Sequence, residues 1–341
     1  MSSPAAAAAA VLVSNGAVSP RAPPSAASFL EANPGAYTTA RGSLLWWPRH
    51  LRRLAESATL LARSHPHLLG LPRPRSLDSF FSETPIHALV NPSVRLAVHE
   101  MRSKMPMVKE DDLALTALIR GGDSISRDGL DVFVHVGTYT PPVFGASGAR
   151  VAVAGTGRDA AAAKYAPWAR MRKSMEKMRP RGVTELLLTN DGDHILEGSV
   201  TNFFVVCQKE HQKKEPFPVQ TLENNFEVQT APISDGILPG VIRQIVIEVC
   251  HDIGIPVREV SPSWSNHELW QEAFVTSSLR LVQHVESVQV PLLWEDIESK
   301  TWSDVSWAVK EFQGAGCITT RIQAEILKRA RTNEYDINKF L

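Results

Sequence analysis

The chain has 341 residues, in which 36 lysines and arginines balance 36 aspartates and glutamates, so its formal net charge is zero. A neutral chain lacks the basic excess typical of proteins that bind nucleic acid, and no apolar run reaches the roughly 18 residues that a membrane span needs. Its three cysteines form no CxxC pair or Cys/His cluster, so we expect neither a disulfide scaffold nor a metal site. The composition is that of a soluble, intracellular protein, and the length allows two domains of about 150 residues.

The N-terminal segment carries an alanine run, and we predict a disordered Ala-rich tail over residues 1–10. The first thirty residues are rich in serine and contain no acid, which is also compatible with an organellar transit peptide. With the segment interpreted as a disordered tail, we expect a cytoplasmic location, with plastid or mitochondrion left open. Residues 11–13 are apolar and precede Ser14-Asn15-Gly16, which predicts a first strand and turn.

The first half of the chain reads as a small α/β domain. Apolar residues recur at helical spacing over 50–65, which predicts an amphipathic helix. Apolar runs at 113–119 and 131–136 predict strands, and His135 in the second of these is interpreted as a core or edge histidine. A stretch rich in Gly, Pro and Ala follows, so we place the domain boundary near residue 145. The expected domains are then 11–145 and 146–335.

The second half mixes helices and strands. A stripe of Trp and Met residues over 168–178 predicts the core-facing side of one helix, which Pro180 ends. Asp191-Gly192 predicts a hairpin between strands at 185–189 and 195–196. An apolar stripe predicts a helix over 241–253 with Gly254 at its C-terminal cap. Further strands are expected at 150–154, 203–207, 255–260 and 273–276.

The common catalytic motifs are absent. The sequence contains no GxxxxGK[ST] phosphate loop, no GxGxxG after a strand and no HExxH zinc motif. The residues alone therefore indicate a mixed α/β protein of two domains without indicating its chemistry.

An ordered series of segments nonetheless resembles one family. The segments are Ala163-Lys164-Tyr165, 185–192 (ELLLTNDG), 196–204 (LEGSVTNFF), 234–243 (SDGILPGVIR) and 272–279 (EAFVTSSL), with 35–41, 47–54 and 314–319 as flanking matches. This series resembles the class IV aminotransferases, the fold-type IV pyridoxal-phosphate (PLP) enzymes. They include branched-chain aminotransferases, D-amino-acid aminotransferases and aminodeoxychorismate lyases. The resemblance implies an α/β (α+β) chain with a small N-terminal α/β domain and a larger, β-barrel-like C-terminal domain with helices.

The resemblance assigns the residues that act at the reacting end of the cofactor. A PLP enzyme needs a lysine amine to hold the cofactor aldehyde as a Schiff base and to move the substrate α-proton. Lys164 matches this lysine by its spacing to Glu197, whereas Lys173 falls on the polar face of the predicted helix. Glu197 matches the carboxylate that pairs with the pyridine nitrogen and favours its protonated form; the alternative is a turn carboxylate. Asn202 matches a residue that supports this loop.

The resemblance also assigns a phosphate site. The phosphate is expected at a helix N-terminus, where the backbone N–H groups of Val241 and Ile242 point outward. Arg53 matches the arginine that clamps the phosphate, in competition with the neighbouring Arg52. In this family the helix commonly carries threonine where this chain has Ile242. The missing hydrogen bond to a charged group would cost about 1.5–3 kcal/mol, enough to loosen cofactor binding.

The remaining matches concern the ring and the substrate. Ser277 and Ser278 match a small hydroxyl or amide pair near phosphate and substrate, and Ile237 supports one face of the ring by packing. The segment after Lys164, residues 165–168 (YAPW), lies where aminotransferases often carry Asn and Tyr. Pro167 and Trp168 would reshape the substrate pocket, a departure that bears on the substrate class more than on the fold.

The implied function is amino-group transfer between an amino acid, branched-chain or D, and a 2-oxo acid. Its partners are then small molecules, with no nucleic acid or membrane, and the expected assembly is a homodimer. One alternative is aminodeoxychorismate lyase chemistry with release of pyruvate, because residues 276–279 resemble the lyase pattern. Another is a catalytically silent homologue, motivated by Ile242 and the altered segment after Lys164.

Overall fold

The computed structural model describes residues 9–107, 109, 112–122, 129–209 and 225–335. The chain divides into two compact units. Unit 1 comprises Met1–Pro141, Ala163–Met171 and Asn333–Leu341, and unit 2 comprises Pro142–Ala162 and Arg172–Thr332. The predicted mixed α/β class is confirmed, and the domain boundary near residue 145 stays a prediction. Of the expected N-terminal tail, residues 1–8 lie outside the described residues, and Ala10 already belongs to the first strand.

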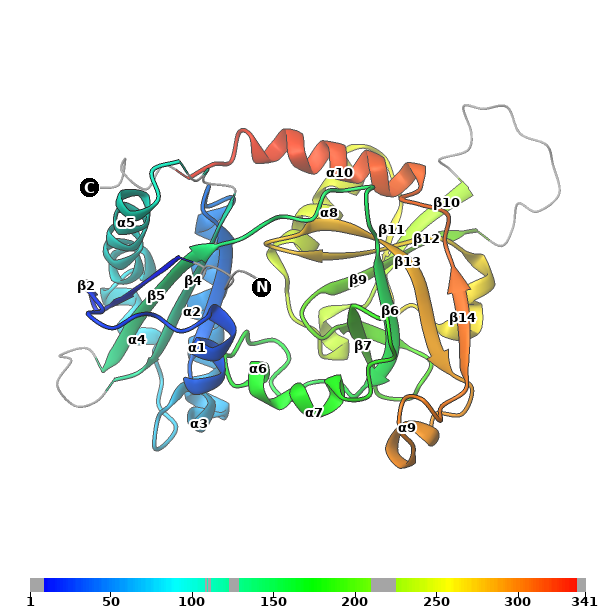
Figure 1. The fold of residues 1–341 in the computed structure, drawn as a ribbon, viewed down its shortest axis with the longest axis horizontal. Helices are drawn as coiled ribbons and strands as arrows, with labels where there is room; N and C mark the ends of the chain where they lie inside the picture. The colour runs from blue at the N-terminus through cyan, green and yellow to red at the C-terminus, as the bar shows by residue number, and fades with distance from the viewer. Residues whose placement is uncertain (1–8, 108, 110–111, 123–128, 210–224, 336–341) are drawn as a thin grey trace, which may run out of the picture. The chain divides into compact units, whose positions relative to one another are not determined.

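Unit 1 is built on a five-stranded antiparallel sheet (Figure 1). Its strands are β1 (Ala10–Ser14), β2 (Ala17–Val18), β3 (Ala36–Arg41), β4 (Leu113–Gly121) and β5 (Leu130–Thr138). Their order is β2-β1-β5-β4-β3, and the three strands predicted in this half are confirmed. Asn15 and Gly16 both have positive φ, which suits the tight turn between β1 and β2.

Two long helices pack on this sheet. Helix α2 (Trp47–Ser64) lies against β3, and α5 (Ile86–Lys104) lies against β1 and β5. The predicted helix at 50–65 is confirmed, and it begins earlier because Pro48 suits the first turn of a helix. Helix α5 had no counterpart in the sequence-based prediction. The shorter helices of unit 1 are α1 (Ala26–Ala32), α3 (Pro66–Leu69), α4 (Asp78–Glu83) and α6 (Trp168–Met171).

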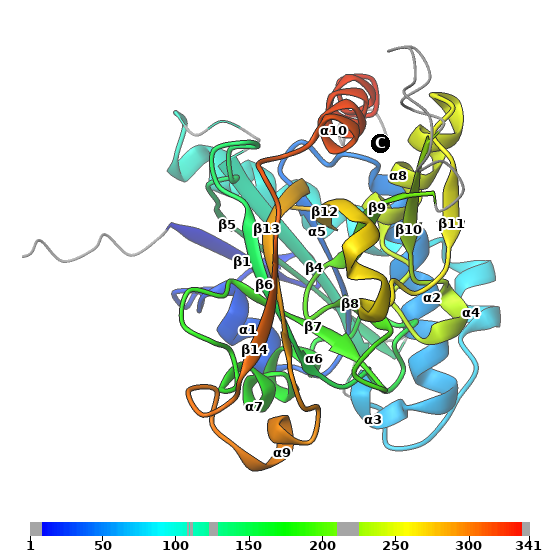
Figure 2. The same ribbon diagram turned by 90° about the vertical axis from the view of Figure 1, so that its right-hand side faces the viewer.

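Unit 2 contains a larger sheet that closes on itself. Its strands are β6 (Ala149–Gly155), β7 (Glu185–Thr189), β8 (Ile195–Gly198), β9 (Asn202–Gln208), β10 (Phe226–Thr230), β11 (Val257–Glu259), β12 (Trp270–Ser277), β13 (Leu281–Pro291) and β14 (Trp307–Glu311). The order is β11-β10-β9-β12-β13-β6-β7-β8, with β14 paired to β13 (Figure 2). Because β8 also pairs with β9 at Glu197 and Asn202, the strands from β9 to β8 form a barrel-like ring. One hydrophobic cluster draws residues from strands all around this ring, including Val151, Phe203 and Val285.

Two helices cover part of this sheet. Helices α8 (Val241–Asp252) and α10 (Cys317–Ala330) pack against each other and against β12. The buried Glu272 carboxylate of β12 accepts hydrogen bonds from the backbone N–H groups of Ile318 and Thr319, at 3.0 and 2.7 Å. An anion at this position stabilises the N-terminus of α10. The remaining elements are α7 (Lys173–Glu176), α9 (Asp296–Ser299), η4 (Ile233–Asp235) and η5 (Trp264–Leu269).

The prediction of a single helix over 168–178 is wrong. The chain forms α6, turns at Arg172 and then forms α7. Trp168 is buried within unit 1, whereas Met175 and Met178 pack on Ala152, Ala154, Val183 and Leu186 of unit 2. The apolar stripe is therefore divided between the two units. None of the helices in the described part of the chain combines the length and apolar character that a membrane span requires.

Candidate functional site

A buried polar stripe on α2 is the main feature of the candidate site in unit 1. His50, Arg53 and Ser57 follow one another at spacings of three and four residues, so they lie on one face of the helix. All three side chains are buried, and Arg53 is only 5% exposed, whereas Arg52 is exposed. Of the two adjacent arginines, the helix therefore carries Arg53 inward.

Thr38 of β3 connects two members of this stripe. Its hydroxyl oxygen accepts a hydrogen bond from Arg53 Nη2 at 3.0 Å and lies 2.8 Å from His50 Nδ1. Burial, followed by the charges of Arg53 and Lys164, holds the pKa of His50 well below its ordinary value, so this histidine is neutral. Burial also lowers the pKa of Arg53 to about 10, which leaves the guanidinium charged at neutral pH. The cluster is therefore cationic.

Arg53 retains a hydrogen-bond donor for a further group. Its Nε is buried and has no hydrogen-bond partner among the described residues. An unsatisfied buried donor is unfavourable, and more so on a charged group, so an anion bound there would restore the missing interaction. Arginine is well suited to phosphate because its donors are arranged in a planar fork.

Lys164 lies in a segment of unit 1 that runs beside the edge strand β3, where Tyr165 forms an antiparallel bridge with Ala36. Its carbonyl oxygen accepts a hydrogen bond from Tyr37 N at 2.9 Å, and its own N–H donates to Ser57 Oγ at 3.1 Å. These bonds fix the backbone on both sides of the side chain. Lys164 Nζ lies 4.7 Å from the centroid of the Tyr37 ring, a cation–π distance. Lys173 lies exposed on α7.

Glu197 is the central residue of the candidate site in unit 2. It lies on β8 where the ring of strands closes, and its side chain is 4% exposed. Oε1 accepts hydrogen bonds from Arg158 Nε and Nη2, at 2.9 and 2.8 Å. Oε2 accepts from Leu238 N at 3.0 Å and, more weakly, from Asn202 Nδ2 at 3.4 Å. Buried carboxylates occur with such donors because their charge must be compensated.

The glycines of the two motifs leave room for this network. Asn202 Nδ2 also donates to Leu238 O at 2.9 Å, so Asn202 connects the loop of Glu197 to the segment before α8. A Cβ on Gly240 would overlap Asn202 Oδ1, and a Cβ on Gly198 would overlap Thr201 Oγ1. Neither glycine has a positive φ, so the close packing accounts for them.

The N-terminus of α8 carries Val241 and Ile242, both buried. Gly240 precedes them as the N-cap residue and has no side chain to cap the helix. The first backbone hydrogen bond at this end of the helix runs from Gln244 N to Gly240 O, at 3.1 Å. The N–H groups of the first turn thus have no acceptor one turn back in the helix, which is the arrangement that binds anions.

Other predicted residues lie elsewhere in unit 2. Ile237 is fully buried against Leu196 and Ala231. Ser277 and Ser278 are half-buried at the end of β12, where Ser277 Oγ accepts a hydrogen bond from Arg280 N at 3.2 Å. Thr276 lies between these serines and the hydrogen-bond network of Glu197, and its backbone lies opposite Asn202 in the sheet.

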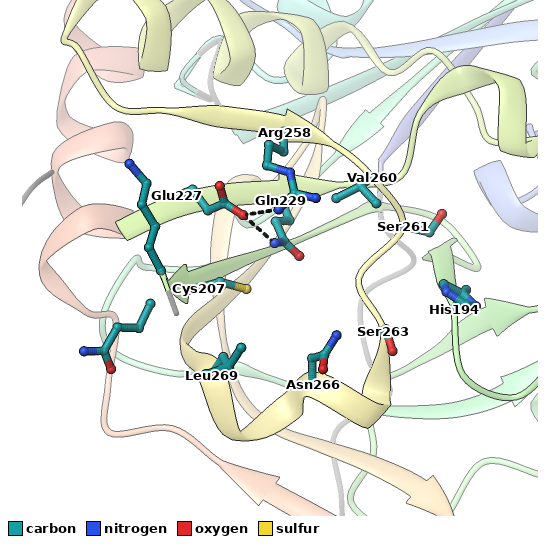
Figure 3. Close-up of a pocket in the computed structure, with 12 residues that line it drawn as sticks. His194, Cys207, Glu227, Gln229, Arg258, Val260, Ser261, Ser263, Asn266 and Leu269 are labelled. Atoms are coloured by element: carbon teal, nitrogen blue, oxygen red, sulfur yellow. Dashed lines mark hydrogen bonds and ion pairs between the residues drawn. The ribbon is translucent and has the colours of Figure 1, made fainter. Parts of the chain in front are cut away.

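A cavity of about 570 Å³ in unit 2 contains none of these residues (Figure 3). It lies beside β9, β10, β11 and η5. Glu227 in its wall accepts hydrogen bonds from Arg258 and Gln229, and the Cys207 sulfur faces the cavity. Burial, followed by the charge of Glu227, raises the pKa of Cys207 to about 12, so the thiol is protonated. The cavity is therefore distinct from the candidate site of unit 2.

Sequence reasoning missed three residues that hold the predicted ones. Thr38 bonds both Arg53 and His50, and Arg158 pairs with Glu197. For His50 a signal existed, because a histidine shares a helical stripe with Arg53. Arg158 had only a weak signal, as an arginine in a stretch rich in Gly and Ala.

Each unit, taken by itself, contains residues that suit part of a phosphorylated pyridine cofactor. Unit 1 supplies a lysine amine and a buried arginine with an unpartnered donor. Unit 2 supplies a buried carboxylate and an uncapped helix N-terminus. In the described part of the chain, no group of three or more His, Cys, Asp or Glu side chains is arranged to hold a metal ion.

Curated relatives match part of the chain. A probable branched-chain-amino-acid aminotransferase of Rickettsia conorii is 26% identical over 117 residues, which cover 34% of this chain and 34% of the relative. Branched-chain-amino-acid aminotransferase 6 of Arabidopsis thaliana is 30% identical over 136 residues, 39% of this chain and 33% of the relative. The chain thus spans about a third of the length of these relatives in the match.

Solved structures match nearly the whole chain. A fold IV-transaminase from Curtobacterium pusillum has a TM-score of 0.62 at 17% identity and covers 93% of this chain and 98% of its own. A putative 4-amino-4-deoxychorismate lyase from Legionella pneumophila has a TM-score of 0.55 at 19% identity, with coverages of 88% and 92%. An aminotransferase from Brucella abortus bound to the co-factor PLP has a TM-score of 0.57 at 16% identity, with coverages of 95% and 100%.

These structures establish that the chain has the fold of the fold-type IV enzymes. The family itself follows from the sequence, since the model of amino-transferase class IV matches residues 35–288, which is more than half of the chain. The protein therefore belongs to the class IV aminotransferase family.

Proposed function

We propose that this protein is a PLP-dependent aminotransferase that moves an amino group between an amino acid and a 2-oxo acid. The observation that carries the proposal is the buried Glu197 carboxylate with four donors around it, in a chain whose family uses PLP. An anion placed so deeply is suited to a cationic ring nitrogen.

The residues that would hold the cofactor are those that the family resemblance assigns. Lys164 provides the amine that binds the aldehyde, and Arg53 Nε together with the N–H groups of Val241 and Ile242 binds the phosphate. Glu197 pairs with the ring nitrogen, and Asn202 keeps the loop of Glu197 in place. Ile237 supports the ring, and Ser277 and Ser278 serve phosphate and substrate.

The chain's own residues then do three things. PLP, when bound, supplies an aldehyde for covalent attachment of amines and a ring that accepts the electron pair of Cα. Lys164 would hold the aldehyde through its amine, and the same amine is the group that would move the proton of the substrate Cα. Arg53 neutralises the phosphate while the neutral His50 and Thr38 keep its guanidinium oriented. Glu197 favours the protonated ring nitrogen.

The substrate we propose is a branched-chain or D-amino acid. Support comes from the curated relatives, which are described as branched-chain-amino-acid aminotransferases. A half-reaction screen over amino acids of both hands, followed in the absorbance of the cofactor, tests this choice. Leucine, isoleucine and valine, or a set of D-amino acids, should convert the cofactor, and a response confined to other amino acids would refute the proposed substrate class.

The test of the function itself uses matched lysine variants. Purified protein should take up PLP and absorb in the visible range. Lys164→Ala should lose this band, and Lys173→Ala, which changes an exposed lysine of the same chain, should retain it. A wild-type protein that stays colourless with added PLP would overturn the proposal.

A lyase is the second candidate function. Its support is the similarity to the Legionella pneumophila protein and the sequence of residues 276–279. Pyruvate release from aminodeoxychorismate without a 2-oxo-acid acceptor would favour the lyase. A protein that binds PLP weakly and shows no half-reaction with any amino acid would instead be a silent homologue, as Ile242 suggests.

We further propose that the working form is a homodimer in the cytoplasm. The mass of the purified protein in solution tests the first statement, since a monomer at working concentration would contradict it. Imaging of the tagged full-length chain tests the second, since import into plastid or mitochondrion would contradict it.

A further inference from the structure

Arg158 and Glu197 form an ion pair in which both side chains are buried. Their side chains are 5% and 4% exposed, and two guanidinium nitrogens of Arg158 lie within 2.9 Å of Glu197 Oε1. Arg158 Nη2 also donates to Ala161 O at 2.8 Å, which anchors the guanidinium to its own segment. Such a pair is costly to bury, so it calls for a role beyond stability.

The two carboxylate oxygens of Glu197 differ in the donors and lengths of their hydrogen bonds. A carboxylate offers about four acceptor positions, and all four are used here. Both bonds to Oε1 are short and come from the charged Arg158. Of the two bonds to Oε2, the one from Asn202 Nδ2 is the longest of the set, at 3.4 Å. Oε2 is therefore the oxygen that can accept a new donor most easily, at the expense of the bond from Asn202.

The charge of Arg158 determines which partner holds a shared proton. A carboxylate buried without a cation would take up a proton, because burial disfavours the charged form. Contact with the guanidinium stabilises the anion instead. A pyridine nitrogen bound to Oε2 would then keep its proton, since the neighbouring carboxylate remains ionised.

We propose that Arg158 is a positioning residue that keeps Glu197 an anion and directs Oε2 to the ring nitrogen of the cofactor. This inference rests on the proposed function and extends it to a residue that does not itself touch the cofactor. The proton between Glu197 and the ring nitrogen stays on the ring nitrogen, so no proton is gained or lost overall.

The test is the protonation state of the ring nitrogen, measured by ¹⁵N NMR on full-length protein loaded with PLP that carries ¹⁵N in the ring. The wild type and Arg158→Lys, which retains the charge, should give the signal of a protonated nitrogen. Arg158→Met should shift the signal to that of the unprotonated ring at the same pH, with the visible band of bound PLP still present. The control Arg181→Met removes an exposed arginine of unit 2 and should give the wild-type signal.

The outcomes separate this inference from the proposed function. A wild type that does not take up PLP refutes the function. Loaded Arg158→Met with a protonated ring refutes the role of Arg158 alone. If Arg158→Met does not fold, Glu197→Gln is added to it: recovery of folding supports charge compensation by Arg158. Failure to recover shows that Arg158 acts by packing, and overturns the inference.

Discussion

Replacement of Gly240 by alanine probes the contact that connects the loop of Glu197 to the start of α8. Gly240 has φ −65° and ψ 137°, so an alanine backbone fits there without strain. The added Cβ would overlap Asn202 Oδ1, and Asn202 is held in place by its bonds to Leu238 O and Glu197 Oε2. The methyl group can be accommodated only if Asn202 gives up these bonds.

The expected magnitudes define a double-mutant cycle. Overpacking costs about 1–3 kcal/mol, and the Gly→Ala change returns about 0.4–1 kcal/mol through the unfolded chain, so Gly240→Ala should lower the unfolding free energy by about 1–2 kcal/mol. Asn202→Ala leaves Leu238 O without this donor and should cost about 1–3 kcal/mol. In the Asn202→Ala background the overlap is absent, so Gly240→Ala should be neutral or stabilising there.

The assay is urea unfolding of the four proteins, followed by tryptophan fluorescence. We expect the two substitutions to deviate from additivity by at least about 1 kcal/mol, in the direction that makes the double variant more stable than the sum predicts. Additive effects would show instead that Asn202 does not restrict position 240.

Three further predictions follow from buried charges and thiols. Glu272→Gln should destabilise the protein by about 1–3 kcal/mol in urea unfolding, because the carboxylate binds the first N–H groups of α10; an unchanged midpoint would contradict this. Burial and the charges of Arg53 and Lys164 lower the pKa of His50, so His50 takes up a proton more readily in the unfolded chain than in the folded one. The associated stability is complete above about pH 6.5 and falls below it by up to about 1.4 kcal/mol per pH unit, and His50→Gln should flatten that part of the profile of apo-protein stability against pH. A thiol reagent should modify Cys317 first in the native protein, since Cys207 and Cys250 are buried and their pKa values are raised to about 12; rapid labelling of all three would contradict the described packing.

Local pattern was sufficient to predict several parts of the fold. Helices α2 and α8 carry an apolar stripe, and the Asp191-Gly192 turn has the residue types that a hairpin requires, so short-range rules applied. The same rules failed at residues 168–178. There the spacing of Trp and Met residues is helical, but the two ends of the stripe pack in different units.

The candidate site was only partly accessible to such reasoning. Lys164, Glu197 and Arg53 came from resemblance to a family, and the burial of Arg53 beside the exposed Arg52 follows from helix periodicity. Arg158 was missed because it lies 39 residues from Glu197 in the chain, and only the pairing of β6, β7 and β8 brings the two together. Thr38 was missed because a strand threonine has no periodic signal that relates it to Arg53.

Chemical trapping shows directly whether Lys164 holds the cofactor. Borohydride reduction of the PLP-loaded protein fixes the cofactor to its lysine, and mass spectrometry of the peptides then locates the modified residue. We expect modification at Lys164 in the wild type and in Lys173→Ala, and none in Lys164→Ala. A cofactor trapped on any other lysine, or on none, would contradict this expectation.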